Sequence, residues 1–278
     1  MSASAPASSG NLGPGYDVLG LALGLRCVVE AAPAEQMTVD DGDGPIPLEP
    51  GDMLFDVVTA AVNRPMALRV DNAIPRARGL GSSSAVTSAS AAASLRALGR
   101  EPARAEVYEI VATVEGHGDN AAPAIWGGLY AVGLNGPRRL DISDRLVPVA
   151  GIPDTHLSTK QAREAVPSEV PLVAAVRNVS RAVLLVEGLR TADPDALAAA
   201  AGDEFHESPR GPLSPITGDM IEAARSAGAL HASWSGAGPT ALALATAETQ
   251  GAVVEALGKV LGDEGTVKVL NVDYEGLK

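Results

Sequence analysis

The chain has 278 residues, and at about 150 residues per domain this length predicts two domains. Hydrophobic residues make up 46% of the chain and aromatic residues only 3%, so the composition excludes global disorder and predicts a core of small and branched aliphatic side chains. The 34 acidic and 21 basic residues give a net charge of −13, which argues against a protein that coats nucleic acid or an anionic membrane.

Cysteine usage and the N-terminus predict a cytoplasmic protein. The single cysteine, Cys27, lies in an apolar stretch and cannot form an internal disulfide, so we interpret it as a buried small hydrophobe. No apolar run reaches the roughly 18 residues that a membrane span needs. The start MSASAPASSG also lacks the basic region and apolar run of a signal peptide.

The first half of the chain alternates between strand-like and helical patterns. A glycine-interrupted segment, NLGPGYDVLGLALGL, leads into a strand-like CVVEA and then a turn-rich acidic loop. Helical spacing predicts a helix over 53–62, and a short strand follows over 67–72. The stretch 83–98 is almost entirely Ala, Ser, Val and Leu, which predicts a helix that is buried on most sides and begins at a serine cap.

A polar cluster, EGHGDN, separates a helix predicted over 102–114 from an apolar helix start and a Gly-Gly turn into a strand. We expect a domain boundary near residue 150, which divides the chain into residues 1–150 and 151–278. The elements predicted after it are helices near 158–165, 173–189, 195–203, 218–227 and 250–261, two strands around the turn in ASWSGAGPTALAL, and a last strand VKVLNV. Neither a G-x-G-x-x-G fingerprint nor a G-x-x-x-x-G-K-[ST] loop occurs.

An anion-binding loop is predicted where the strand over 67–72 leads into the buried helix. Its residues are Arg78, Gly79, Leu80, Gly81, Ser82, Ser83, Ser84 and Ala85. A helix N-terminus carries roughly half a unit of positive charge and several unpaired N–H groups, and glycines let phosphate oxygens approach the backbone. The serine hydroxyls add donors, and one can contact a magnesium ion. Taken alone, GLGSS also fits a plain glycine turn followed by a serine cap.

Three motifs in order resemble the GHMP kinases, small-molecule kinases whose glycine- and serine-rich phosphate loop is unrelated to the Walker type. The motifs are PASSGNLGPGYD (6–17), GLGSSSA (79–85) and SGAGPT (235–240). The blocks EGHGDNAAPAIWGG, LSTKQAREAVP, RNVSRAVLLVEGL and FHESPRGPLSP resemble the homoserine kinase branch, so the likeness covers nearly the whole chain. The resemblance implies a two-domain α+β fold, with an N-terminal α/β ATP-binding domain, a C-terminal ferredoxin-like domain and the acceptor between them.

This resemblance implies ATP as the phosphoryl donor and Mg²⁺ as the accompanying cation. Residues 78–85 would bind ATP, and Ser83 and Glu115 would hold Mg²⁺ between the β- and γ-phosphates. Homoserine kinases have Asn where other branches have a catalytic Asp, and counting back from the Gly-Gly turn puts this position at Asn120. An amide cannot act as a base, so Asn120 would orient the acceptor hydroxyl, with the neighbouring Asp119 as the alternative catalytic residue.

For an amino-acid acceptor, the resemblance implies that Arg163 and Arg210 bind the carboxylate and that Asp17 accepts from the ammonium group. Arg163 is also predicted to be a catalytic residue. Guanidinium groups suit this role because their donors match a carboxylate bidentately. Asn11 and His117 would complete the pocket by hydrogen bonding. Taken alone, each arginine also fits a solvated surface charge.

Gly236 and Gly238 would approach the phosphates or the substrate from the C-terminal domain, although SGAG alone also fits a plain turn between strands. His206 and Arg181 are expected to be structural, and Trp126 and Trp234 are expected to be packing residues. Only five residues precede Pro6, fewer than the family usually has. The pairing of the first strand and part of the adenine pocket therefore stay open.

The reaction implied is the phosphorylation of L-homoserine by ATP to O-phospho-L-homoserine, a step of threonine biosynthesis, by an enzyme that forms a homodimer. One alternative is a GHMP kinase that acts on a sugar, a sugar phosphate or a mevalonate-like acid. A second alternative is a catalytically silent ligand sensor that keeps the scaffold. The presence of Ser83, Glu115 and Asn120 argues against the sensor.

Overall fold

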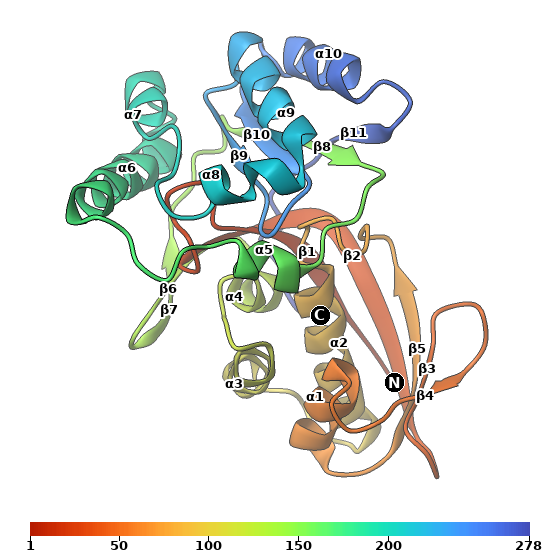
Figure 1. The fold of residues 1–278 in the computed structure, drawn as a ribbon. Coiled ribbons are helices and arrows are strands. Elements are labelled where there is room, and N and C mark those ends of the chain that lie inside the picture. The colour runs from red at the N-terminus through yellow and green to blue at the C-terminus, as the bar shows by residue number, and fades with distance from the viewer.

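The computed structural model describes residues 1–278 and contains two β-sheets (Figure 1). The larger sheet has the order β4-β3-β5-β2-β6-β7, and β1 also pairs with β2. Its strands are β1 (Ser2–Gly10), β2 (Leu19–Pro33), β3 (Thr38–Asp40), β4 (Ile46–Pro47), β5 (Met66–Asn72), β6 (Leu129–Gly133) and β7 (Gly136–Leu140). The helices of this half are α1 (Met53–Val62), α2 (Ser82–Ala97), α3 (Arg104–Glu115) and α4 (Ala121–Trp126).

The extent of the first two strands depends on pairing with distant strands as well as on local sequence. Strand β2 begins at Leu19, well before the CVVEA segment that its sequence predicts, because β1, β5 and β6 all pair along it. Strand β1 pairs with β2 from Ser2 to Gly10 with one register shift, so the short N-terminus still forms a complete strand pair.

Helix α2 is the buried helix predicted from its composition. Eleven of its residues are buried, most of them Ala or Ser, and it packs on β1 and β2. Small side chains let a helix approach a sheet closely, so α2 points its N-terminus at a fixed place above the strands. Cys27 is fully buried in the same core, as predicted.

The second sheet is antiparallel with the order β11-β8-β10-β9. Its elements follow the order β8 (Val147–Pro153), α9 (Pro215–Ser226), β9 (His231–Trp234), β10 (Ala241–Ala245), α10 (Gln250–Leu261) and β11 (Gly265–Val269). The core of this half packs α9 and α10 against the sheet. This βαββαβ arrangement is the predicted ferredoxin-like domain.

Between β8 and α9 the chain forms four further helices, α5 (Thr159–Glu164), α6 (Leu172–Thr191), α7 (Pro194–Ala199) and α8 (Glu207–Arg210). The helix predicted near 195–203 ends early, at Ala199. It stops because Gly202 has a φ of 88° and Asp203 turns its carboxylate to the N–H groups that begin α8.

The boundary predicted near residue 150 stays a prediction. That residue lies within β8, and the last residues of the chain return to the larger sheet, where Ser4 and Lys278 exchange two backbone hydrogen bonds of 2.9 Å. None of the helices combines the length and the hydropathy that a membrane crossing requires. The two halves also meet at β1 and the phosphate loop, where the N–H groups of Gly236 and Thr240 donate to Gly10 O and Arg78 O.

Candidate active site

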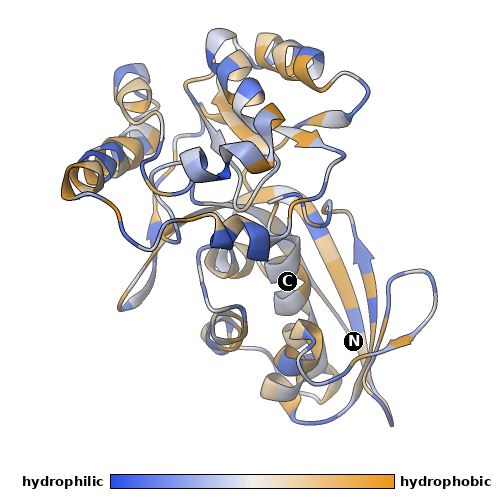
Figure 2. Cartoon of the chain, in the orientation of Figure 1, coloured by the Kyte–Doolittle hydropathy of each residue, from blue (hydrophilic) through white to orange (hydrophobic).

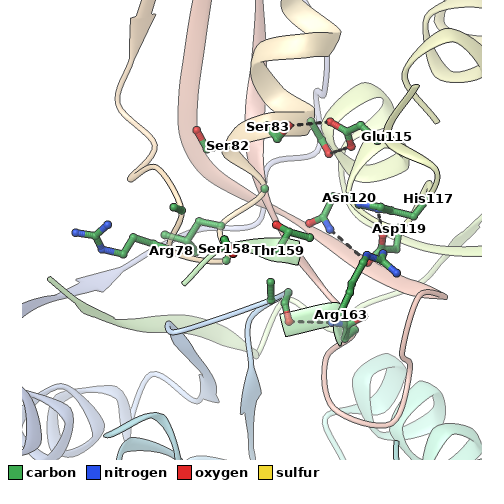
Figure 3. A pocket seen from close by; sticks show the side chains of 18 of the residues that line it. Arg78, Ser82, Ser83, Glu115, His117, Asp119, Asn120, Ser158, Thr159 and Arg163 are labelled. Atoms are coloured by element: carbon green, nitrogen blue, oxygen red, sulfur yellow. Dashed lines mark hydrogen bonds and ion pairs between the residues drawn. The ribbon is translucent and has the colours of Figure 1, made fainter. Parts of the chain in front are cut away.

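A cavity of about 490 Å³ lies where the two halves meet, and it brings together most of the residues predicted for the site. The predicted residues that line it are Asn11, Asp17, Arg78, Gly79, Leu80, Gly81, Ser82, Ser83, Ser84, Glu115, His117, Asp119, Asn120, Arg163, Arg210 and Gly236. Figure 3 shows Ser82, Ser83 and Glu115 on one side and Arg163 on the other. Ala85 and Gly238 do not line the cavity.

The phosphate loop needs glycine at two positions. Gly79 and Gly81 have φ angles of 77° and 62°, and a Cβ would lie 2.1 Å from Ser235 O and 2.0 Å from Ser8 Oγ, respectively. Gly81 directly precedes α2 and no side chain caps the helix. The first N–H groups of α2 are therefore available to an anion at the cavity.

Three hydroxyl groups of α2 surround the carboxylate of Glu115, the last residue of α3. Ser83 Oγ donates to Glu115 Oε1 at 3.2 Å, Ser84 Oγ donates to Oε2 at 2.5 Å, and Thr87 Oγ1 donates to Oε1 at 3.2 Å. Burial raises the pKa of Glu115, and the hydroxyl donors oppose that shift. No cluster of three or more His, Cys, Asp or Glu side chains offers a metal site by itself. A cation bound at Ser83 and Glu115 would therefore need further oxygen ligands, which phosphates supply.

The turn between α3 and α4 carries His117, Asp119 and Asn120. Asp119 is buried, and its two oxygens lie 2.8 Å from His117 Nδ1 and 3.3 Å from Asn120 Nδ2. Burial lowers the pKa of His117, but the hydrogen bond and charge of Asp119 outweigh it, so this pKa lies above its usual value. Ser8 Oγ donates to Asn120 Oδ1 at 3.0 Å, which fixes the orientation of the amide.

On the opposite side of the cavity, Arg163 of α5 forms a bidentate ion pair with Asp17. The two N···O distances are 3.0 and 2.9 Å, and both side chains are a little over one third exposed. Ser158 caps α5 by accepting from the N–H of Gln161 and so fixes the start of the helix.

Arg210, by contrast, is buried and held by protein acceptors. Its Nε donates to Ala162 O at 2.9 Å and its Nη1 to Gly236 O at 3.1 Å. Burial lowers the pKa of Arg210. The two arginines predicted to act as a pair thus differ, since Arg163 is exposed to the cavity and Arg210 is fixed in place.

The SGAG turn joins the two halves rather than simply connecting strands. Ser235 Oγ donates to Gly79 O at 2.7 Å, and the N–H of Gly236 donates to Gly10 O at 3.0 Å. Gly238 lies against the ring of Trp234, and a Cβ at position 238 would be 2.4 Å from that ring. Glycine is therefore required at position 238 by packing, and its contact with substrate stays a prediction.

Arg78 was predicted as part of the ATP-binding loop, and its side chain is bound to other groups of the protein. Its guanidinium donates to Pro153 O at 2.7 Å and Asp154 O at 2.5 Å, and it lies 2.6 Å from His156 Nδ1. Figure 3 shows it directed away from Ser83 and Glu115. Arg78 thus connects the phosphate loop to the segment after β8, and only its backbone is free to contribute to an anion site.

The structure adds residues that the sequence did not single out. Met53, Pro75, Ala77, Ser158, Thr159 and Ala237 also line the cavity. Ser8 and Thr87 support it through their contacts with Asn120 and Glu115. Ser8 lies within the PASSGNLGPGYD motif, but its contact and that of Thr87 could not be predicted, because their partners lie 112 and 28 residues away.

Comparisons with known proteins agree with this geometry. The family models "GHMP kinases N terminal domain" and "GHMP kinases C terminal" match residues 53–128 and 185–263. A homoserine kinase of Thermus thermophilus is 39% identical over 96% of this chain and 94% of its own length. That of Moorella thermoacetica is 39% identical over 86% of this chain and 85% of its own.

Solved structures show the same fold over the whole chain. The crystal structure of homoserine kinase from Cytophaga hutchinsonii is similar with a TM-score of 0.86 and 25% identity, and covers 100% of this chain and 96% of that one. A mevalonate kinase structure reaches a TM-score of 0.73 at 12% identity, covering 99% and 100%, which shows the fold alone. The chain therefore belongs to the GHMP kinases and, within them, to the homoserine kinase family.

Proposed function

We propose that this kinase transfers the γ-phosphoryl group of ATP to the side-chain hydroxyl of L-homoserine, giving ADP and O-phospho-L-homoserine. The observation that carries the proposal is a single cavity with an open helix N-terminus on one side and an Arg–Asp pair on the other. The first feature suits a triphosphate and the second suits the two charges of an amino acid. The proposed product is an intermediate of threonine biosynthesis.

The backbone of residues 79–84 binds the phosphates in this proposal. Glycine at positions 79 and 81 keeps the backbone accessible, and the N-terminus of α2 stabilises negative charge. Ser83 and Glu115 would hold Mg²⁺, since both offer the oxygen ligands that this cation prefers. Mg²⁺ bound there would offset the charge of the β- and γ-phosphates.

The acceptor's carboxylate would bind Arg163 and Arg210, and its ammonium group would bind Asp17. Arg163 and Asp17 form an ion pair with each other. A bound zwitterion would replace this pair with two, one between its carboxylate and Arg163 and one between its ammonium group and Asp17. A neutral sugar has no charges to make that exchange. Asn11 and His117 also line the cavity and would add hydrogen bonds.

Asn120 would orient the acceptor hydroxyl, because Ser8 already fixes its amide. Asp119 is buried and uses its oxygens for His117 and Asn120, which favours Asn120 as the residue that contacts the hydroxyl. Phosphoryl transfer passes through a loose transition state, so alignment and charge stabilisation matter more than early removal of the proton.

An acceptor screen with purified protein, ATP and Mg²⁺ tests the proposal. We expect turnover of L-homoserine to exceed that of sugars, sugar phosphates and mevalonate, with O-phospho-L-homoserine as the product. Rapid turnover of a sugar or mevalonate without turnover of homoserine would favour the other kinase activities. ATP binding without turnover of any acceptor would favour a silent sensor.

We further propose that the enzyme works in the cytoplasm, where its lone buried Cys27 stays reduced.

We also propose that it forms a homodimer through α6. Leu172, Val176, Val179 and Val183 are 61–80% exposed and are spaced four and three residues apart on one face of α6 (Figure 2). This coiled-coil spacing lets two copies of the helix pair, and no acidic residue lies between 172 and 186 to repel a second copy of a chain whose net charge is −13. A Val179→Glu variant should then sediment as a monomer.

A further inference from the structure

The loop between β1 and β2 carries two of the proposed acceptor contacts, Asn11 at its start and Asp17 near its end. Asn11, Leu12 and Asp17 have φ angles of 71°, 53° and 54°, a left-handed conformation that costs free energy in a residue other than glycine. Within the loop, the N–H of Asp17 donates to Asn11 Oδ1 at 2.9 Å, and further contacts come from outside the loop. Figure 1 shows the loop in red beside α6 and α8.

Three consecutive carbonyl oxygens of this loop accept hydrogen bonds from buried side chains of the second half of the chain. The pairs are His231 Nε2 with Leu12 O at 3.0 Å, His206 Nε2 with Gly13 O at 2.9 Å, and Asn178 Nδ2 with Pro14 O at 2.9 Å. All three donor residues are at most 2% exposed. The loop's position is therefore set by the C-terminal half and not by β1 and β2 alone.

The partners of His206 determine its tautomer. A carbonyl oxygen only accepts, so Nε2 must carry the proton that it donates to Gly13 O. In a neutral ring Nδ1 is then an acceptor, and the guanidinium Nη1 of Arg210, which only donates, lies 3.0 Å from it. Burial also lowers the pKa of His206, which favours the neutral ring.

His206 thus connects the acceptor loop to Arg210, whereas the His231 ring contacts the loop and makes no hydrogen bond to Arg210. Nδ1 of His231 has no hydrogen-bond partner. The ring of His206 also stacks on Tyr16, with centroids 5.1 Å apart, and the Arg210 guanidinium lies 5.4 Å from the same Tyr16 ring. Tyr16 directly precedes Asp17, so the loop's ammonium-binding end and the buried arginine share one support.

We propose that His206 is a positioning residue that sets the separation between Arg210 and Asp17, and thereby the affinity and selectivity for a zwitterionic acceptor. His206 lies outside the set of residues that contact the cavity, and it acts through its two ring nitrogens on groups that do line it. The proposal rests on the proposed function, because it assumes an acceptor that carries both a carboxylate and an ammonium group.

Two substitutions separate the two ring nitrogens. In His206→Gln the amide nitrogen can still reach Gly13 O, but the acceptor for Arg210 is lost. In His206→Asn an acceptor remains near Arg210, but the donor to Gly13 O is lost. Each variant should raise the KM for L-homoserine by about tenfold, the size expected when a buried or charged group loses its hydrogen-bond partner. Neither should change the KM for ATP by more than about twofold, which is within the ordinary spread for a site that does not contact ATP.

The matched control is His231→Gln, which keeps the one hydrogen bond that His231 makes. It should leave the KM for both substrates within about twofold, so that a change seen only in the His206 variants is not a general effect of replacing a buried histidine. Equal increases in both KM values, an unchanged KM for homoserine, or an equal increase in the control would overturn the proposal.

A measurement on the unmodified protein needs no substrate and no stable variant. The chain has only four histidines, so a long-range ¹H–¹⁵N spectrum of histidine-labelled protein at pH 7 resolves each ring. We expect His206 as a neutral ring with its proton on Nε2. A doubly protonated ring, or a proton on Nδ1, would overturn the proposal even where wild-type turnover of homoserine upholds the function. Absence of homoserine turnover together with the expected tautomer would instead contradict the function alone.

Discussion

At the residue scale, burial shifts the pKa of several ionisable side chains beside the site. Glu207 at the start of α8 illustrates this. Its Oε1 accepts from the backbone N–H of Trp234 at 2.9 Å, and burial raises its pKa to about 7 from 4.5. Trp234 directly precedes the turn that holds the phosphate loop, so the ionisation of Glu207 bears on the stability of that connection.

The raised pKa predicts a pH-dependent stability. Between pH 4.5 and about 7 the folded protein retains a proton on Glu207 that the unfolded chain has released. The contribution of this group to the free energy of unfolding therefore falls as pH rises through that window and is fully lost above it. Glu207→Gln keeps an acceptor and never ionises. The free energy of unfolding of Glu207→Gln minus that of wild type should therefore rise by about 2 kcal/mol from pH 5 to pH 8, allowing for partial exposure.

Urea unfolding at several pH values, with the exposed Glu222→Gln as control, checks this prediction. A pH-independent difference between Glu207→Gln and wild type would show that Glu207 is already ionised in the folded protein.

A second residue-scale prediction concerns Glu115, the one carboxylate surrounded by the α2 hydroxyl groups. Glu115→Gln removes the charge that would hold Mg²⁺, so kcat/KM should fall about 100-fold or more, while the far-ultraviolet circular dichroism stays unchanged. Glu109→Gln, on the exposed face of the same helix α3, should retain wild-type activity. A loss of less than about threefold in Glu115→Gln would mean that the cation binds elsewhere.

At the element scale, α2 is the helix on which the site depends. Its composition predicted its burial, and its N-terminus was placed within one residue because the glycines and serines of the loop are local signals. The predicted serine cap was wrong, since Gly81 precedes the helix and no side chain caps it. The extent of β2 was not predicted, because it depends on pairing with β1, β5 and β6. The same reason explains Ser8, whose contact with Asn120 joins β1 to the α3–α4 turn.

The close packing of α2 predicts that it tolerates no larger side chain. Ala92 is fully buried in the core that α2 forms with β1 and β2. Ala92→Leu should destabilise the protein by about 1–3 kcal/mol through overpacking. Ala105→Leu, on an exposed position of α3, should stay within about 0.5 kcal/mol of wild type. Denaturant unfolding compares them, and equal stabilities would contradict the close packing inferred for α2.

At the scale of the whole molecule, the site exists only because two sheets meet around β1 and the phosphate loop. Composition and motifs predicted the two-domain fold and most cavity residues. They did not predict that the Arg78 guanidinium donates to Pro153 O and Asp154 O across the junction, or that Gly238 packs against Trp234 of its own half. A sequence motif identifies residues that a fold brings together, but side-chain direction depends on contacts across the domain junction.

Ser235 is one such contact across the junction, since its hydroxyl donates to Gly79 O. Ser235→Ala removes this hydrogen bond and also the 2.9 Å contact with Ser9 Oγ, but only the first holds the phosphate loop. Its loss, worth about 1 kcal/mol, should weaken ATP binding about fivefold. Ser233→Ala is the matched control, because the Ser233 hydroxyl is equally buried and has no partner. Steady-state KM values for ATP test this prediction. An increase of the same size in both variants would show that the effect comes from packing and not from the hydrogen bond.

The central claim is that the triphosphate and the amino acid occupy opposite sides of one cavity. A crystal structure with a non-hydrolysable ATP analogue, Mg²⁺ and L-homoserine tests it most directly. We predict the γ-phosphate beside the backbone of residues 79–84, the carboxylate of homoserine at Arg163 or Arg210, and its ammonium group at Asp17. A triphosphate bound away from α2, or homoserine bound with its ammonium group toward the arginines, would contradict the account.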